Sequence, residues 1–241
     1  MPGWRTPDVM VPGWRTIGVI GGMGPAATAD FLALLVAGVA AARDTDHPRV
    51  LVDSNPHVPD RNAAALHGGP SPGPALAAMA QGLVRQGAGV LAMPCNAAHG
   101  WADAITAANP ETPFVSMIDA AIAEAMVNGP RAIGVLAVGA TLALDVYGRS
   151  CPVPVLAGDL AVVQPAVNAI KAGDTGEGVR AALAGAAARL VAAGAQVIIA
   201  ACTEVPLVLG QGDVAVPLIN STAALARATL AAARLPDRVG A

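Results

Sequence analysis

Aromatic residues are scarce in this chain of 241 residues, where tryptophan, tyrosine and phenylalanine together make up 2%. Proteins that hold single-stranded nucleic acid stack its bases on aromatic rings, so the composition disfavours that class of protein. Charged residues are also few, at 13%, and a net charge of −3 leaves no basic surface to neutralise phosphates. The sequence therefore favours a small molecule as partner and no nucleic acid.

Long apolar runs are missing as well. The longest uninterrupted run covers residues 31–42, and a membrane-spanning helix needs about 20 residues. No basic segment followed by an apolar stretch opens the chain, so we expect neither a secretory signal nor a membrane partner. Three cysteines are too few for a disulfide framework and indicate a reducing, cytoplasmic location.

Lysine is almost absent, since Lys171 is the only lysine among 14 basic residues. A genome that favours arginine codons explains such a bias. The functional interpretation is that Lys171 has a task for which arginine is a poor substitute, because a compact ammonium and a planar guanidinium bind differently.

The first sixteen residues contain the pentapeptide PGWRT twice, at residues 2–6 and 12–16. This density of proline and glycine predicts a flexible leader over residues 1–16. Beyond it, short β-branched runs alternate with helical patterns, which is typical of an α/β fold with parallel sheets. Strands are expected at residues 16–21, 49–53, 89–93, 114–117, 132–138, 153–156, 196–200 and 216–219, and helices at 26–42, 74–86, 117–127, 162–172 and 178–193.

Three segments of the first half of the chain recur in the second half. Residues 15–20 match 131–136 at an offset of 116, residues 86–96 match 193–203 at 107, and residues 112–115 match 216–219 at 104. Their common order and nearly equal offsets predict two similar parallel-sheet α/β domains. If a pseudo-twofold axis relates these domains, the active site lies in the cleft between them.

Two of the cysteines occupy equivalent positions of this repeat. Cys95 and Cys202 each follow a predicted strand, at the sheet edge where ligands of α/β proteins bind. A helix beginning there would lower the pKa of each thiol. Two such groups facing one cleft suit proton removal from one face of a carbon and proton return to the other. Cys151 has no counterpart in the repeat, and we interpret it as structural.

The motifs around these cysteines resemble a known family, the cofactor-independent aspartate/glutamate racemases of the Asp/Glu/hydantoin racemase superfamily. The resemblance covers residues 17–233 and implies two domains, formed by residues 17–115 with 214–235 and by residues 116–213. It also implies a homodimer and a reaction without cofactor or metal. The motifs are IGVIGGMGP at 17–25, NPHVPDR at 55–61, MPCNAAH at 93–99, AIKAG at 169–173 and ACTEVP at 201–206.

By this resemblance, Cys95 and Cys202 are the catalytic acid/base pair. Arg61 and Lys171 fall on the family's cationic positions, which bind substrate carboxylates. Glu204 either contacts substrate or orients its own loop. The substrate-binding positions that the resemblance implies are Met23, Asn55, Arg61, Asn96, Ala97, Lys171, Thr203 and Glu204.

The chain also departs from the family pattern. Ala97 and Asn62 stand where the family commonly has threonine, and residues 137–141 read AVGAT where an Ala-Thr-x-Gly-Thr run is usual. Hydroxyl groups are lost near the carboxylate positions, which bears on the substrate more than on the reaction type. Both cysteines are kept, unlike in the related arylmalonate decarboxylases, which keep one.

Other functions fit part of the pattern. Cys95 and His99, four residues apart, also fit a Cys–His hydrolase or, with Cys202, a zinc site. The glycines at 21–24 lack the spacing of a nucleotide loop. A hydantoin racemase or another related isomerase, and a non-catalytic protein that binds an amino acid or dicarboxylate, remain alternatives. The sequence favours a racemase that interconverts L- and D-aspartate, with glutamate as the second choice.

Overall fold

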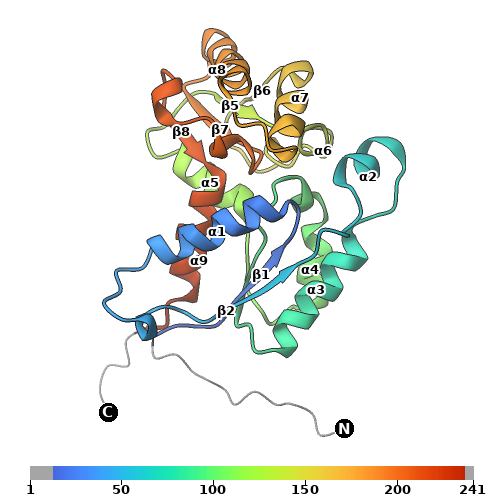
Figure 1. Ribbon diagram of the computed structural model, residues 1–241, viewed down its shortest axis with the longest axis vertical. Helices are drawn as coiled ribbons and strands as arrows, with labels where there is room; N and C mark the ends of the chain where they lie inside the picture. Colours follow the sequence, from blue (N-terminus) through green and yellow to red (C-terminus); the bar gives the residue numbers. More distant parts are fainter. Residues whose placement is uncertain (1–12, 237–241) are drawn as a thin grey trace, which may run out of the picture.

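Two parallel four-stranded sheets, each flanked by helices, form the molecule (Figure 1). The computed structural model describes residues 13–236. The first sheet, with strand order β2-β1-β3-β4, belongs to what we call the first lobe, and the second sheet, with order β6-β5-β7-β8, to the second lobe. The strands are β1 (Ile17–Gly21), β2 (Val50–Ser54), β3 (Val90–Ala92), β4 (Phe114–Val115), β5 (Ile133–Leu136), β6 (Val155–Ala157), β7 (Val197–Ala200) and β8 (Leu218–Asn220).

The sequence repeat is a repeat of strand order and register. Strands β1 and β3 pair Ile17 with Val90, and β5 and β7 pair Ile133 with Val197, positions that the offsets of 116 and 107 relate. The outer pairs β3–β4 and β7–β8 match in the same way. The predicted α/β fold with two similar parallel-sheet domains is therefore confirmed.

A packing contact explains why the repeat keeps glycine and alanine. A Cβ placed on Gly18 in β1 would lie 2.8 Å from the Cβ of Ala88, and one on Gly134 in β5 would lie 3.2 Å from that of Ala195. In both lobes, the segment that leads into the neighbouring strand of the sheet (β3 or β7) packs directly against a glycine of the first strand. Protein interiors are close-packed, so neither site has room for a methyl group.

The central strands β1, β3, β5 and β7 are buried throughout, and the outer strands are only partly buried. Helices on both faces of a parallel sheet produce this pattern. No helix of residues 13–236 is long and apolar enough to cross a membrane. The helices are α1 (Pro25–Ala37), α2 (Arg61–His67), α3 (Gly73–Arg85), α4 (Ala102–Ala108), α5 (Met117–Ala125), α6 (Gly139–Ala143), α7 (Leu160–Lys171), α8 (Glu177–Ala192) and α9 (Ser221–Ala233).

Helix α1 ends earlier than the sequence predicts. Its C-cap is Gly38, whereas the apolar pattern predicted helix to residue 42. A Cβ on Gly38 would lie 2.5 Å from Cδ1 of Leu230 in α9. The helix stops where a segment from the far end of the chain packs against it.

The last segments of the chain join both lobes. Strand β8 pairs with β7 in the second sheet, whereas the expected assignment places residues 214–235 in the first domain. Helix α9 then packs against α1, β3 and β4 of the first lobe, and also against α5 (Figure 1). Strand β8 is thus part of the second sheet, and α9 is the element that returns to the first lobe.

Residues 1–12 of the expected leader lie outside the described residues, but residues 13–16 are ordered. Trp14 forms an antiparallel bridge with Arg234 and is 8% exposed. Its Nε1 donates a hydrogen bond of 3.0 Å to the carbonyl of Asp46. The Arg234 guanidinium lies 4.7 Å from the centre of the Trp14 ring. The large indole is thus buried and paired, so residues 13–16 are structured and do not belong to a flexible leader.

Candidate active site

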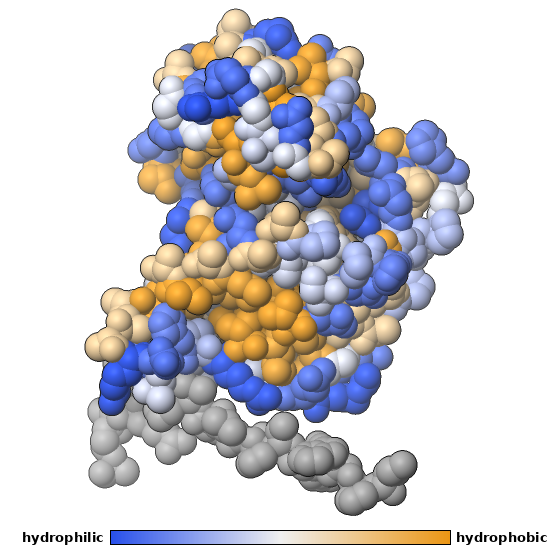
Figure 2. Space-filling view, viewed as in Figure 1, coloured by the Kyte–Doolittle hydropathy of each residue, from blue (hydrophilic) through white to orange (hydrophobic). Residues whose placement is uncertain are grey.

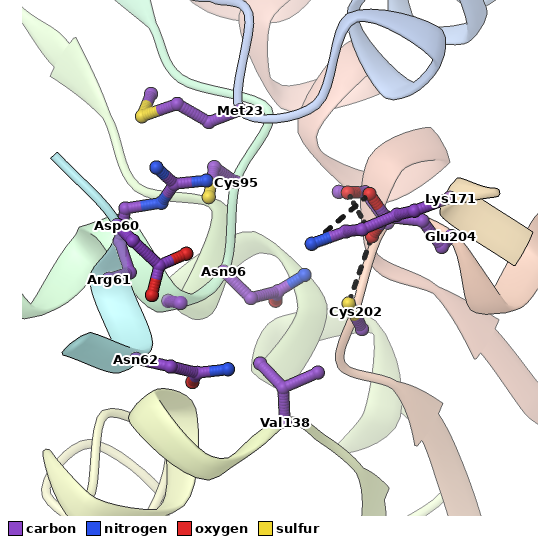
Figure 3. Close-up of a pocket in the computed structure, with 12 residues that line it drawn as sticks. Met23, Asp60, Arg61, Asn62, Cys95, Asn96, Val138, Lys171, Cys202 and Glu204 are labelled. Carbon is purple, nitrogen blue, oxygen red and sulfur yellow. Dashed lines mark hydrogen bonds and ion pairs between the residues drawn. The ribbon is translucent and has the colours of Figure 1, made fainter. Parts of the chain in front are cut away.

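A cavity of about 370 Å³, counted with its open mouth, lies where the carboxyl ends of strands from both sheets face each other (Figure 3). Residues from both lobes line it. They are Met23, Asp60, Arg61, Asn62, Cys95, Asn96, Ala97, Val138, Lys171, Cys202, Thr203 and Glu204. The cavity thus brings together all the candidate residues of the sequence except Asn55.

The two cysteines face this cavity from opposite sides (Figure 3). Cys95 follows β3 and is 5% exposed, and Cys202 follows β7 and is 7% exposed. Both are free thiols. The fold thus places the repeat-related cysteines at equivalent points of the two lobes.

The expected lowering of the thiol pKa by helix N-termini is wrong. The segments after the cysteines are short 3-10 turns, Ala97–Trp101 and Val205–Leu207, which lack the summed dipole of a long helix. Burial raises the pKa of the Cys95 thiol above its ordinary value, and burial also raises that of Cys202. The desolvation of a buried thiolate outweighs the donors nearby.

The charges around the cysteines differ between the two lobes. The cations of Arg61 and Lys171 oppose the rise in the pKa of Cys95. At Cys202 the anion of Glu204 and the hydrogen bond to it add to the effect of burial, so its pKa stands well above the usual value. Cys202 is therefore the more firmly protonated of the two.

Glu204 contacts the loop of Cys202, to which it also belongs. Its carboxylate is buried, at 3% exposure of the residue. Oε2 accepts hydrogen bonds from the Cys202 thiol at 3.0 Å and from the Thr203 hydroxyl at 3.2 Å. Oε1 lies 3.9 Å from Nζ of Lys171. Glu204 thus contacts its own loop and also lines the cavity.

Each lobe supplies one cation beside one cysteine. Arg61 begins α2, whose N-cap Asp60 accepts a 2.7 Å hydrogen bond from the amide of Ala63. The Arg61 guanidinium extends to the Cys95 side of the cavity, and Lys171, the last residue of α7, reaches in from the Cys202 side (Figure 3). Positive charge is thus available at two separated points of the cavity.

Asn55 was expected to line the pocket, but it is not among the residues that line this cavity. Its Oδ1 accepts a 2.9 Å hydrogen bond from the amide of His57, and its Nδ2 lies 3.9 Å from the sulfur of Met79. An asparagine that bonds the backbone two residues on closes a local turn. Asn55 therefore shapes the loop that leads to Arg61.

Three lining residues were not among the predicted site residues. Asp60 precedes Arg61 within the same motif, and Asn62 and Val138 occupy positions where the chain departs from the family pattern. Asn62 bridges the lobes, since its Oδ1 accepts a 2.8 Å hydrogen bond from the amide of Ala140. For Asn62 and Val138, the departure of the sequence from the family pattern could have identified them as site residues.

His99 does not act on the Cys95 thiol. Its Nε2 accepts a 2.9 Å hydrogen bond from the amide of Met117, so Nδ1 carries the proton and donates to the carbonyl of Cys95 at 2.9 Å. Burial lowers the pKa of His99 to about 4. Because both ring nitrogens bond the backbone, the ring is neither a general base nor a metal ligand, which argues against the hydrolase and zinc alternatives.

Comparison with known proteins addresses the family directly. A family model of Asp/Glu/hydantoin racemases matches residues 20–229. The chain belongs to the Asp/Glu/hydantoin racemase family. This membership makes the protein an isomerase of the racemase class and confirms the resemblance predicted from the motifs.

Solved structures of this family share the two-lobed fold. Aspartate racemase from Picrophilus torridus is 28% identical with a TM-score of 0.81, over 92% of this chain and 96% of that one. An aspartate racemase homologue from Pyrococcus horikoshii is 22% identical with a TM-score of 0.73, over 90% and 98%. Glutamate racemase from Francisella tularensis, in complex with D-glutamate, is 17% identical with a TM-score of 0.65, over 88% and 78%.

Proposed function

We propose that the protein interconverts the L- and D-forms of an acidic amino acid, aspartate first and glutamate second, without a cofactor. One observation carries this proposal. Cys95 and Cys202 face one cavity from equivalent points of two lobes. Two acid/base groups on opposite sides of a substrate carbon can invert it.

The reaction follows from that geometry. In one direction the Cys95 thiolate takes the α-proton, and the electron pair of the broken C–H bond moves onto the α-carboxylate as an enediolate. The Cys202 thiol then gives its proton to the opposite face of the carbon. Cys95 ends as a thiol and Cys202 as a thiolate, and the reverse reaction restores the starting state.

The surroundings of each cysteine suit both of its roles. Glu204 takes the proton of Cys202 through their 3.0 Å hydrogen bond when Cys202 must be a base, and returns it when Cys202 must be an acid. Arg61 stabilises the thiolate of Cys95. Cations at the α-carboxylate hold the charge that develops on it in the transition state.

A substrate with two carboxylates fits the charge pattern best. Arg61 and Lys171 lie on opposite sides of the cavity (Figure 3), so one carboxylate can meet each. A neutral hydantoin ring has no carboxylate to pair with either cation, so it would leave this charge pattern unused. The similarity to an aspartate racemase at 28% identity supports aspartate as the first choice.

Two further features belong to this proposal. Thiols that face one pocket must stay reduced, as they do in the cytoplasm.

Apolar side chains gather over β2 below α1 (Figure 2). Val36 of α1 and Val52 of β2 are 60% and 40% exposed. Such a patch suits a second copy of the chain, in keeping with the homodimer that the family resemblance implies.

The test is α-proton exchange. The protein is incubated with L-aspartate and then L-glutamate in deuterated buffer, and NMR follows the loss of the α-proton beside chiral analysis of the product. We expect exchange together with appearance of the D-enantiomer, and loss of racemisation in Cys95→Ser and in Cys202→Ser. Binding of either amino acid without exchange would instead identify a binding protein, and turnover of a hydantoin alone would exclude the acidic substrate.

A further inference from the structure

The only tyrosine of the chain, Tyr147, contacts the residue next to a candidate catalytic cysteine. It lies after α6 in the second lobe and is 3% exposed. Its hydroxyl donates a 2.6 Å hydrogen bond to Oδ1 of Asn96, which belongs to the first lobe and lines the cavity. Tyr147 itself is not among the lining residues.

This bond begins a chain of three hydrogen bonds. Nδ2 of Asn96 donates to Oγ of Ser221 at 3.1 Å, and the Ser221 hydroxyl donates to the carbonyl of Ala200 at 2.7 Å. Asn96 and Ser221 are 3% and 0% exposed. The chain of bonds therefore runs from the loop of Cys95 to the last residue of β7, two positions before Cys202.

The chemistry fixes the direction of every bond in this chain. The carbonyl of Ala200 can only accept, so Ser221 donates to it and must accept from Asn96. The amide nitrogen of Asn96 therefore faces Ser221, and its oxygen faces Tyr147. One hydrogen of that nitrogen remains, and the nitrogen points into the space between the cysteines (Figure 3).

We propose that Tyr147 is a positioning residue that holds the amide of Asn96 with this remaining N–H aimed at the substrate. The inference rests on the proposed racemase function, in which the N–H donates to the carboxylate that gains charge. A donor fixed in place before reaction costs no reorganisation in the transition state. A rotated amide would present an oxygen to the same carboxylate and repel it.

Tyr147→Phe tests the proposal, since phenylalanine keeps the ring and removes the hydroxyl. We expect kcat to fall about tenfold with a smaller change in KM, which is the effect of losing one well-placed hydrogen bond in the transition state. Thr229→Val, in α9 and away from the cavity, is the matched control. It removes another buried hydroxyl, and that hydroxyl has no hydrogen-bond partner among the described residues. Its kcat should stay within about twofold of the parent.

A double variant separates positioning from general damage. If Tyr147 acts through Asn96, Asn96→Ala with Tyr147→Phe should be no slower than Asn96→Ala alone. Rate losses that multiply in the double variant would overturn the proposal. So would a control variant that loses as much activity as Tyr147→Phe.

A second measurement does not depend on turnover. Protein labelled with ¹³C at tyrosine Cζ gives one resonance, because the chain has one tyrosine. Succinate should shift that resonance in the parent protein and leave it unmoved in Asn96→Ala. A shift without racemase activity would uphold the positioning of Asn96 and contradict the reaction. No shift in the parent at tens of millimolar succinate would overturn the positioning, whatever the activity.

Discussion

The thiol of Cys202 donates a 3.0 Å hydrogen bond to Oε2 of Glu204, and both residues are buried. No carboxylate within hydrogen-bond distance matches it at Cys95 among the described residues, where the guanidinium of Arg61 is the main charge nearby. The two cysteines are alike in fold position and unlike in electrostatics. A pair that exchanges acid and base roles would benefit from this difference, because Cys202 has a neighbouring carboxylate that can accept its proton.

Glu204→Gln should lower the pKa of Cys202, because the negative charge that raises it is gone. Alkylation of Cys202 by iodoacetamide, followed over pH by mass spectrometry, should then begin at lower pH. Racemisation should fall by about 10²-fold, the usual contribution of a proton acceptor. Glu111→Gln, at an exposed position, is the control. An unchanged alkylation profile in Glu204→Gln would contradict the assigned contact.

Lys171→Met should weaken binding of a dicarboxylate such as succinate by about tenfold or more, since one of the two cavity cations is lost. Lys171→Arg should restore only part of the affinity, because the planar fork cannot occupy the ammonium's place beside Glu204. Isothermal titration gives both dissociation constants. Arg131→Met, an exposed cation in the loop before β5, should bind like the parent. Equal affinity of the parent and Lys171→Met would exclude the proposed carboxylate contact.

The stability of the protein should decrease as the pH is lowered, because His99 is protonated more easily in the unfolded chain. Its pKa is lowered to about 4 from an ordinary value of 6.5, so between these values the unfolded chain binds the proton more tightly. The stabilisation is therefore complete above pH 6.5 and is lost as pH falls toward 4, by up to roughly 3 kcal/mol. Urea unfolding at pH 7, 5.5 and 4.5 measures it. His99→Gln should lose this part of the pH dependence. If the free energy of unfolding changed equally with pH in both proteins, the prediction would be contradicted.

Gly22→Ala should destabilise the protein more than Gly87→Ala does. Both glycines have positive φ, at +91° and +97°, so alanine is strained at either site by about 1 kcal/mol or more. A Cβ at Gly22 would also collide with the backbone of Asn55, whereas Gly87 has open space around it. Thermal unfolding of the two variants compares them. Equal losses of stability in the two variants would show that the loop of Asn55 can shift to accommodate the Cβ without cost.

Much of the fold could be predicted from the sequence because the same sequence pattern occurs in both halves of the chain. The glycine at 18 and the alanine at 88 recur at 134 and 195, and each pair makes the same contact inside one lobe. The ends of elements were less predictable where distant segments decide them. Helix α1 ends at Gly38, where Leu230 leaves no room for a Cβ, and no local pattern contains that contact.

The site was predictable where residues lie in one motif and not where they meet only in space. The cysteines, Arg61 and Lys171 were found in advance, whereas Tyr147 reaches Asn96 across 51 residues and carries no motif. The direction of the thiol pKa values was mispredicted because it depends on burial and on charges from several loops. Asn55 has the right motif and a side chain that turns back on its own loop.

The return of α9 to the first lobe has a consequence for how the protein is made. The first sheet is synthesised early, but α9, the helix that packs on α1, β3 and β4, follows the whole second lobe in the chain. The second lobe, from α5 to β8, is continuous in the chain and can close before it. The first lobe cannot complete its packing until the second lobe has been synthesised, so loss of α9 would destabilise the part of the protein that is translated first.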